Sequence, residues 1–95
     1  MSGINSYKDL LIWQKGIDIA INLYELVEDF PKEEIYALTS QLKRASISIS
    51  SNIAEGYGRN YKKDYSRFLQ ISRGSLFECQ TQIEIALNLG FISNI

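Results

Sequence analysis

The sequence of 95 residues contains no histidine, one cysteine and one proline. Histidine is the commonest general base and metal ligand in proteins, so its absence removes the usual acid–base and zinc-site chemistry. Cys79 has no partner for a disulfide within the chain, which fits a reducing compartment. No stretch approaches the roughly 20 apolar residues that span a bilayer, and no signal peptide opens the sequence. We therefore expect a cytoplasmic protein with no metal, no cofactor and no membrane partner.

Motifs for nucleotide binding and nucleophilic catalysis are also missing. The sequence has no P-loop and no Gly-x-Ser-x-Gly element. Gly56-Tyr57-Gly58 is similar to the start of a dinucleotide-binding motif but lacks the third glycine and the preceding strand. Glu55 has only Asp64 nearby as a second carboxylate, and Arg59 at i+4 favours an ion pair over catalysis. We expect no catalytic residues and no enzyme activity.

The residues that are present favour a small helical domain. The chain is 45% hydrophobic and 12% aromatic, which is typical of a folding sequence and not of a disordered one. The single proline, Pro31, and the scarcity of hairpin dipeptides favour helices over sheet. We expect one domain, residues 1–95, whose core is marginal when the chain is alone.

Apolar or small residues recur at spacings of three and four in three segments, which predicts helices at about residues 7–29, 33–57 and 61–89. Ser6 is the predicted N-cap of the first helix, and Phe30-Pro31 ends it. Gly56–Gly58 and Gly90 are the predicted ends of the second and third helices. Short connections predict an all-α, up-and-down antiparallel bundle. The residues predicted to face the core are Leu10, Trp13, Ile17, Ala20, Tyr24 and Val27; Ile35, Leu38, Leu42, Ala45, Ile49, Ile53 and Gly56; and Tyr65, Phe68, Ser72, Leu76, Cys79, Ile83 and Ala86.

The run from Leu38 to Arg59 is rich in Ser, Ala and Gly, which lets a neighbouring backbone come close and predicts a packing surface. It also resembles the signature of the 23S rRNA intervening-sequence proteins, the four-helix bundle protein family. Ser50 departs from that signature, which usually has proline there, so we expect a straighter second helix. The matching residues are Leu38-Thr39-Ser40-Gln41-Leu42, Lys43-Arg44-Ala45 and Ser51-Asn52-Ile53-Ala54-Glu55-Gly56, with Trp13-Gln14-Lys15 in the first helix.

The resemblance implies several properties of a bacterial protein. Members of the family, and the accessory proteins of diversity-generating retroelements that they are similar to, form ring-shaped homopentamers of four-helix protomers. The retroelement accessory proteins bind nucleic acid through a positively charged surface, and the 23S rRNA gene setting of the family suggests a link to RNA. On this resemblance residues 91–95 would begin a fourth helix that is largely missing from this chain. Trp13, Asn52, Glu55 and Gly56 would be structural motif residues.

Charge is unevenly distributed along a chain whose net charge is −1. Residues 1–40 hold three basic and seven acidic residues, whereas residues 41–75 hold seven basic and two acidic ones. On a helix of about 100° per residue, Lys62, Lys63, Arg67 and Arg73 fall within an arc of about 140°. The candidate nucleic-acid-binding residues are Lys43, Arg44, Arg59, Lys62, Lys63, Arg67 and Arg73.

Two functions remain open at this point. In the first, the basic residues of an oligomer contact the phosphates of RNA or another nucleic acid, and Tyr57 and Tyr61 stack on unpaired bases. In the second, the protein is an assembly scaffold, the charges keep it soluble, and both tyrosines pack at the corner between the second and third helices. Corner packing is the commoner role for such tyrosines.

Overall fold

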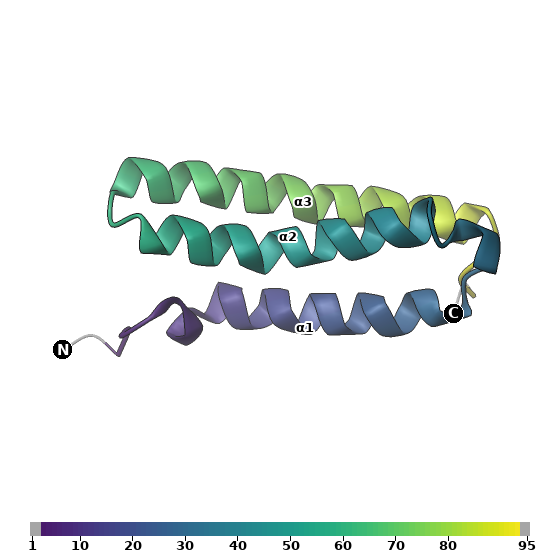
Figure 1. The fold of residues 1–95 in the computed structure, drawn as a ribbon, viewed down its shortest axis with the longest axis horizontal. Helices are drawn as coiled ribbons and strands as arrows, with labels where there is room; N and C mark the ends of the chain where they lie inside the picture. The colour runs from purple at the N-terminus through teal and green to yellow at the C-terminus, as the bar shows by residue number, and fades with distance from the viewer. Residues whose placement is uncertain (1–2, 94–95) are drawn as a thin grey trace.

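The described part of the chain contains three long helices and three short 3-10 turns (Figure 1). The computed structural model describes residues 3–93. No strand occurs in that range, so the predicted all-α class is confirmed. The α-helices are α1 (Leu11–Leu26), α2 (Leu38–Gly58) and α3 (Lys62–Asn88), and the 3-10 turns are η1 (Tyr7–Asp9), η2 (Val27–Asp29) and η3 (Lys32–Glu34).

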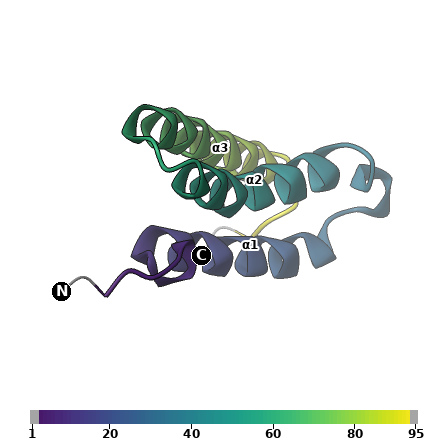
Figure 2. The same cartoon turned by 60° about the vertical axis from the view of Figure 1, so that its left-hand side comes forward.

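The central helix of the bundle is α2, which packs against α1 on one side and α3 on the other (Figures 1 and 2). Successive helices run in opposite directions, as expected for an up-and-down bundle with short connections. The molecule is elongated, with extents of 48 × 22 × 21 Å. Because α1 and α3 each pack mainly on α2, one side of the bundle between them stays open.

The first helix begins later than predicted. Ser6 is a cap, as expected: its hydroxyl accepts from the Lys8 N–H, and the Asp9 carboxylate accepts from the Ser6 N–H at 3.2 Å. This capping box closes only the 3-10 turn η1. Leu10 then has extended backbone angles (φ −74°, ψ 126°), so the α-helix starts at Leu11. The predicted range 7–29 is therefore one α-helix between two 3-10 turns.

The second helix also begins later than its predicted start at residue 33. Lys32–Glu34 form the separate turn η3, and Ala37 (φ −123°, ψ −109°) interrupts the helical backbone before Leu38. The carboxylate of Glu34 accepts from the Leu38 N–H at 3.3 Å and so serves the free amide at the start of α2. Ile35, predicted to face the core, is exposed because it precedes the helix. That prediction is wrong.

The corner between α2 and α3 is built differently from the predicted glycine cap. The helix α2 continues through Gly58, and the residue with a left-handed backbone is Asn60 (φ 66°). Asparagine is among the few residues besides glycine that adopt this conformation readily. Gly56 is needed for another reason, because a Cβ there would lie 2.6 Å from Cβ of Phe68. It allows α2 and α3 to approach closely.

Gly90 ends α3 as predicted, with a left-handed φ of 82°. The Gly90 N–H donates to the Leu87 carbonyl at 3.1 Å, and the Phe91 N–H donates to the Ala86 carbonyl at 2.9 Å. This pair of bonds is the Schellman pattern of a helix C-terminus. The chain then turns back, and the Phe91 ring lies 5.6 Å from that of Phe30. Residues 91–93 are not helical, and residues 94–95 of the predicted fourth-helix segment lie outside the described residues.

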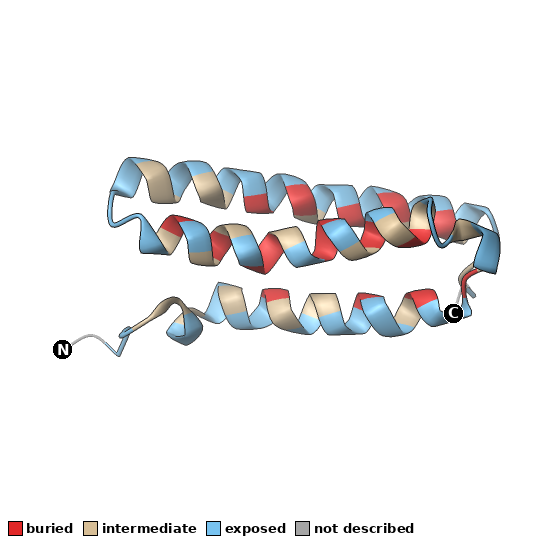
Figure 3. Cartoon of the chain, viewed as in Figure 1, coloured by how far each residue is buried: buried red, intermediate tan, exposed pale blue. Residues whose placement is uncertain are grey.

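The core lies along α2 and the faces that α1 and α3 turn toward it (Figure 3). Tyr24 was predicted to face the core but is 39% exposed, and Gly16 and Leu23 are buried instead. A methyl group at position 16 would overlap the Ser50 side chain, so the buried face of α1 is set by this close approach to α2. The buried apolar residues are Leu23, Val27, Phe30, Leu42, Ala45, Ile49, Ile53, Cys79 and Ala86.

Serine residues contribute to the buried helix contacts. The Ser72 hydroxyl donates to the Ile49 carbonyl at 2.7 Å, which links α3 to α2. The Ser75 hydroxyl donates to that of Ser48 at 2.8 Å across the same interface. Short side chains bring the backbones together, and the hydrogen bonds satisfy the hydroxyl groups that this buries. The packing surface predicted from the composition of α2 is therefore present.

Candidate nucleic-acid interface

Basic side chains gather where the chain turns from α2 into α3. Arg59 follows the last residue of α2, Asn60 reverses the chain, and Tyr61 is the extended N-cap residue of α3 (φ −122°, ψ 132°). Lys62, Lys63 and Arg67 then follow in the first two helical turns of α3, next to this connection. We call this group, Arg59, Lys62, Lys63 and Arg67, the basic corner. Lys62, Lys63 and Arg67 belong to α3, Arg59 directly follows α2, and all four are exposed.

The Phe68 ring supports both arginines of the basic corner. The guanidinium carbons of Arg59 and Arg67 each lie 5.1 Å from the centre of the ring, within the range of a cation–π contact. Phe68 thereby joins the end of α2 to the second turn of α3. The side chains keep substantial exposure, 47% for Arg59 and 62% for Arg67, so the stacking orients the guanidinium groups without removing them from solvent.

Two carboxylates partly neutralise the basic corner. Glu55 Oε2 lies 3.2 Å from an Arg59 terminal nitrogen, the i,i+4 ion pair that the spacing predicted. Asp64 Oδ1 lies 3.9 Å from Arg67. Exposed pairs of this kind are weak, so incoming phosphates can compete for the arginines. Four cations and two anions leave the basic corner with a net charge of +2.

The start of α3 adds to this positive potential. Tyr61 provides no side-chain hydrogen bond to the first turn, whose backbone N–H groups carry the positive end of the helix dipole. Asp64 is the acidic residue in that turn. The dipole is equivalent to about half a positive charge, and it lies next to Lys62 and Lys63.

The two tyrosines of the corner have different environments. The ring of Tyr57 packs edge-on against that of Tyr65, with centres 6.1 Å apart and planes at 82°, so Tyr57 packs as the commoner role predicted. Tyr61 is 71% exposed, which contradicts the packing predicted for it. Sequence reasoning missed Asn60, although an asparagine directly after a helix end is a recognised signal for a left-handed residue.

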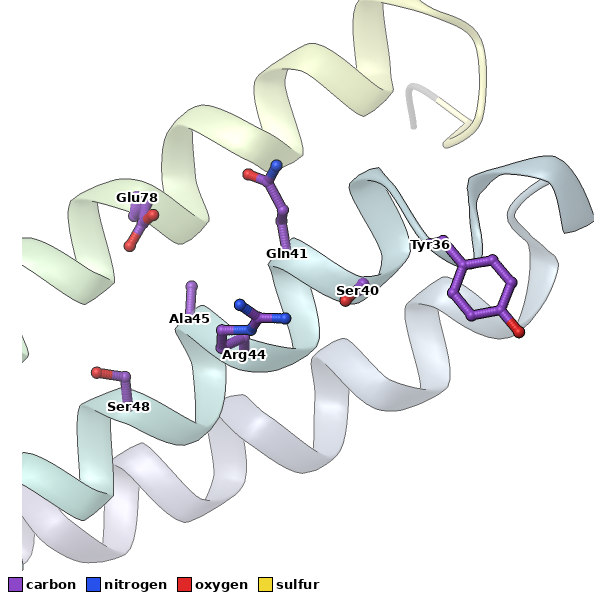
Figure 4. A pocket seen from close by; sticks show the side chains of 7 residues that line it. All are labelled: Tyr36, Ser40, Gln41, Arg44, Ala45, Ser48 and Glu78. Carbon is purple, nitrogen blue, oxygen red and sulfur yellow. The ribbon is translucent and has the colours of Figure 1, made fainter.

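The other three candidate residues lie elsewhere. Lys43 turns toward α1, where its ammonium nitrogen lies 4.9 Å from the Tyr24 ring centre. Arg44 lies about 22 Å from Arg59 along α2, at 1.5 Å per residue. Figure 4 shows Arg44 and Ser48 projecting from α2 into a polar concavity that Glu78 of α3 also lines. The predicted basic surface on the second and third helices is therefore divided.

Arg73 borders the open side of the bundle instead of the basic corner. Its guanidinium carbon lies 5.3 Å from the Phe77 ring centre. It stands at the edge of a largely apolar groove of about 310 Å³ between α1 and α3. The groove is lined by Ile12, Lys15, Gly16, Ile19, Ile49, Ile53, Leu69, Ser72, Arg73 and Leu76.

A sequence model of the 23S rRNA-intervening sequence protein family matches residues 8–95. The match covers nearly the whole chain and includes all three α-helices. The chain belongs to this family. A search of curated proteins finds no match. The family resemblance predicted from the Leu38–Arg59 run is thus confirmed.

In this family member the residues of the shared motif make contacts within a helix or between neighbouring elements. Asn52 donates to the Ser48 carbonyl and hydroxyl, both at 2.8 Å, and so stays within α2. Trp13 packs edge-on against Tyr7, with ring centres 5.3 Å apart. Gly56 provides the close contact with Phe68, and Glu55 pairs with Arg59. Each contact is local or lies between neighbouring elements, as expected of structural residues.

Within residues 3–93 no cluster of three or more His, Cys, Asp or Glu side chains could hold a metal ion. No helix in that part of the chain is long and apolar enough to cross a membrane. Cys79 is buried, and its burial, followed by the charge of Glu78, raises the pKa of the thiol. A neutral, buried thiol is a poor nucleophile.

Proposed function

We propose that this protein is a non-enzymatic, oligomeric helical-bundle protein that binds RNA or another nucleic acid through phosphate contacts. The observation that supports the proposal is the basic corner, where four exposed cations lie in the connection after α2 and in the first two turns of α3. Their arrangement favours a chain of phosphates over a small ligand, because the four cations are exposed and spread over nine residues of the chain from Arg59 to Arg67. No base-specific contact is needed for such binding.

Electrostatics favour a phosphate ligand at this position. Arginine can bind phosphate through two parallel hydrogen bonds, and lysine acts as a mobile point charge. Each phosphate that is neutralised releases condensed counterions, which makes affinity steeply dependent on salt. Four contacts give only weak binding for one chain, but several copies acting on one nucleic acid raise the total affinity greatly.

Oligomer formation is the second part of the proposal. The groove between α1 and α3 leaves the apolar side chains of Ile12 and Ile19 without a covering helix among the described residues. Exposed apolar surfaces of this kind often mark association sites. The resemblance to proteins that form homopentameric rings supports a pentamer, in which one basic corner from each chain would contribute to a shared field.

A titration with structured RNA at several salt concentrations tests the nucleic-acid role. For about four phosphate contacts per chain, the slope of log K against log salt should be about −3 to −4. Replacing Lys62, Lys63 and Arg67 together by alanine should weaken binding and reduce the slope by about 2 to 3. The matched control replaces Lys8, Lys32 and Lys43 by alanine, which changes the net charge equally but lies outside both the basic corner and the apolar groove.

The two triple variants separate a local site from a general charge effect. Equal weakening in both would mean that net charge alone controls binding and would reject the basic corner as the site. Binding without a salt slope would reject phosphate contacts altogether. Retention of wild-type affinity and slope by the basic-corner variant would also reject the proposal.

A protein-assembly scaffold is the second candidate function, and the apolar groove is the observation that favours it. In that case the cations serve solubility only. A scaffold would show a defined oligomer by light scattering and no retention of RNA at physiological salt. The same purified protein can be tested for both properties, so the two functions are separated in one experiment.

A further inference from the structure

A concave surface lies beside the basic corner and contains three tyrosines. It has a volume of about 290 Å³, close to the lower limit for small-ligand sites. Aromatic and amide side chains dominate it, together with one lysine. We call it the tyrosine corner, and it is lined by Gly56, Tyr57, Asn60, Tyr61, Lys62 and Tyr65.

The tyrosines of this surface combine a fixed wall with an exposed ring. Tyr57 and Tyr65 hold each other edge-on, 6.1 Å apart, so their rings form the wall. Tyr61 has 71% of its surface exposed even though it is an aromatic residue at a helix start. The Tyr61 side chain forms no capping hydrogen bond with the first turn of α3, so helix capping does not account for a tyrosine at this position. An exposed aromatic face is suited to stacking on a planar ring.

The cations next to this surface indicate which kind of planar ligand it can bind. Lys62 belongs to both the tyrosine corner and the basic corner, and Arg59 and Lys63 are its close neighbours in sequence. A ligand that stacks on Tyr61 would therefore place any attached phosphates near these cations. A nucleotide within a strand has this combination of a planar base and flanking negative charges. Asn60 carries an amide that can donate to or accept from the edge of a base.

We propose that the tyrosine corner is a stacking site for an unpaired base, so that the protein prefers single-stranded nucleic acid to a duplex. This inference rests on the nucleic-acid binding proposed above and specifies its ligand. Bases in a duplex are already stacked on their neighbours, and only phosphates remain accessible to Tyr61 and the cations. Unpaired bases can turn outward and stack on the ring.

The test compares a single-stranded RNA 12-mer, carrying 2-aminopurine near its centre, with the duplex of the same sequence at each of several salt concentrations. The variants are Tyr61→Ala and Tyr61→Phe. The matched control is Tyr36→Ala, because Tyr36 is 96% exposed and precedes the start of α2 (Figure 4), whereas Tyr61 follows the end of that helix. Tyr61 is exposed and does not cap α3 through its side chain, so its replacement should leave the fold intact.

The wild-type protein should bind the single strand about five to ten times more tightly than the duplex, and binding should quench the 2-aminopurine fluorescence. Tyr61→Ala should lose both effects and bind the two forms equally. Tyr61→Phe should keep them, because stacking does not use the hydroxyl. Tyr36→Ala should behave as wild type.

Other results overturn the inference in distinguishable ways. Salt-dependent binding of both RNA forms with equal affinity, unchanged in Tyr61→Ala, would reject the stacking site and leave the phosphate-binding function in place. An equal loss in Tyr36→Ala and Tyr61→Ala would reject a site specific to Tyr61. No salt-dependent binding of either form would reject the proposed function together with the inference.

Discussion

Gly56 determines how closely two helices can approach. It lies in α2, where a Cβ atom would meet Cβ of Phe68 on α3 at 2.6 Å. The Phe68 Cβ is attached directly to the backbone and cannot rotate away, so the two helices would have to separate. Gly74 lies in the middle of α3, and a Cβ atom added there would have no neighbouring atom within 4 Å. A side chain is therefore sterically excluded at Gly56, whereas there is free space for one at Gly74.

We expect Gly56→Ala to lower the free energy of unfolding by about 1–3 kcal/mol, because the methyl group forces the packed helices apart. Gly74→Ala should raise it by up to about 1 kcal/mol, since alanine favours an exposed helix over glycine. Urea denaturation followed by circular dichroism measures both. Stabilisation by both substitutions would show that α2 and α3 do not pack as closely as described.

The buried thiol of Cys79 makes the free energy of unfolding depend on pH. Burial raises the pKa of its thiol in the folded protein, so the unfolded chain loses the thiol proton at lower pH than the folded one. The unfolded state then binds fewer protons, and the free energy of unfolding falls as pH rises above about 8.5. Below that pH the thiol is neutral in both states and its contribution is constant.

Denaturation at pH 7 and at a series of values up to 10 should therefore show a decline that is smaller in Cys79→Ala. The comparison uses the slopes, because the substitution also leaves a small cavity that lowers stability at every pH. An identical pH dependence in the two proteins would show that the thiol does not contribute to it.

At the scale of secondary-structure elements, serines join α2 to α3. Ser72 is buried, and its hydroxyl donates to the Ile49 carbonyl, a backbone group of the neighbouring helix. Ser66 lies on the same helix but is exposed. The same Ser→Ala change therefore alters helix propensity at both sites but removes a contact between helices at only one.

We expect Ser72→Ala to be about 0.5–1.5 kcal/mol less stable than Ser66→Ala, because it loses a buried hydrogen bond with a net contribution of that size. Ser66→Ala alone should be neutral or slightly stabilising. Thermal unfolding of the two variants and the wild type measures the difference. Equal stability of the variants would mean that the hydrogen bond of Ser72 adds nothing to stability and that the serines of the interface matter only for their small size.

At the scale of the whole molecule, the bundle is longer and more open than a compact domain. Its Cα radius of gyration is 15.1 Å, compared with about 12 Å expected for a compact chain of this length. The elongation follows from three helices packed side by side, and the groove between α1 and α3 is left open. Association through that groove would bury the apolar residues that line it.

If the proposed oligomer forms through the groove, Ile12→Glu should reduce the mass measured by light scattering toward that of one chain, because a buried charge opposes association. Ile85→Glu is the matched control, since Ile85 on α3 is similarly exposed, 45% against 46% for Ile12, but lies outside the groove. Loss of the oligomer in both variants, or in neither, would show that the groove is not the association surface.

Much of the bundle could be predicted from local patterns. The spacing of Leu42, Ala45, Ile49 and Ile53 predicted the buried face of α2, and Gly90 predicted the end of α3. These features depend on neighbours within about one helical turn. The site was less predictable. Charge counting found all four members of the basic corner but grouped them with Lys43, Arg44 and Arg73, which face other surroundings.

The sequence by itself determined the helical class, the family and most of the core, because helical periodicity and the Leu38–Arg59 motif are carried by residues close together in the chain. Only the tertiary structure decided that Gly16 is a contact point, that Gly56 meets Phe68, that Tyr61 is exposed and that the Phe68 ring contacts two arginines. Each of these features depends on the rotation of one helix against another. That rotation is set by packing across the interface between two helices, and the periodicity of one helix does not specify it.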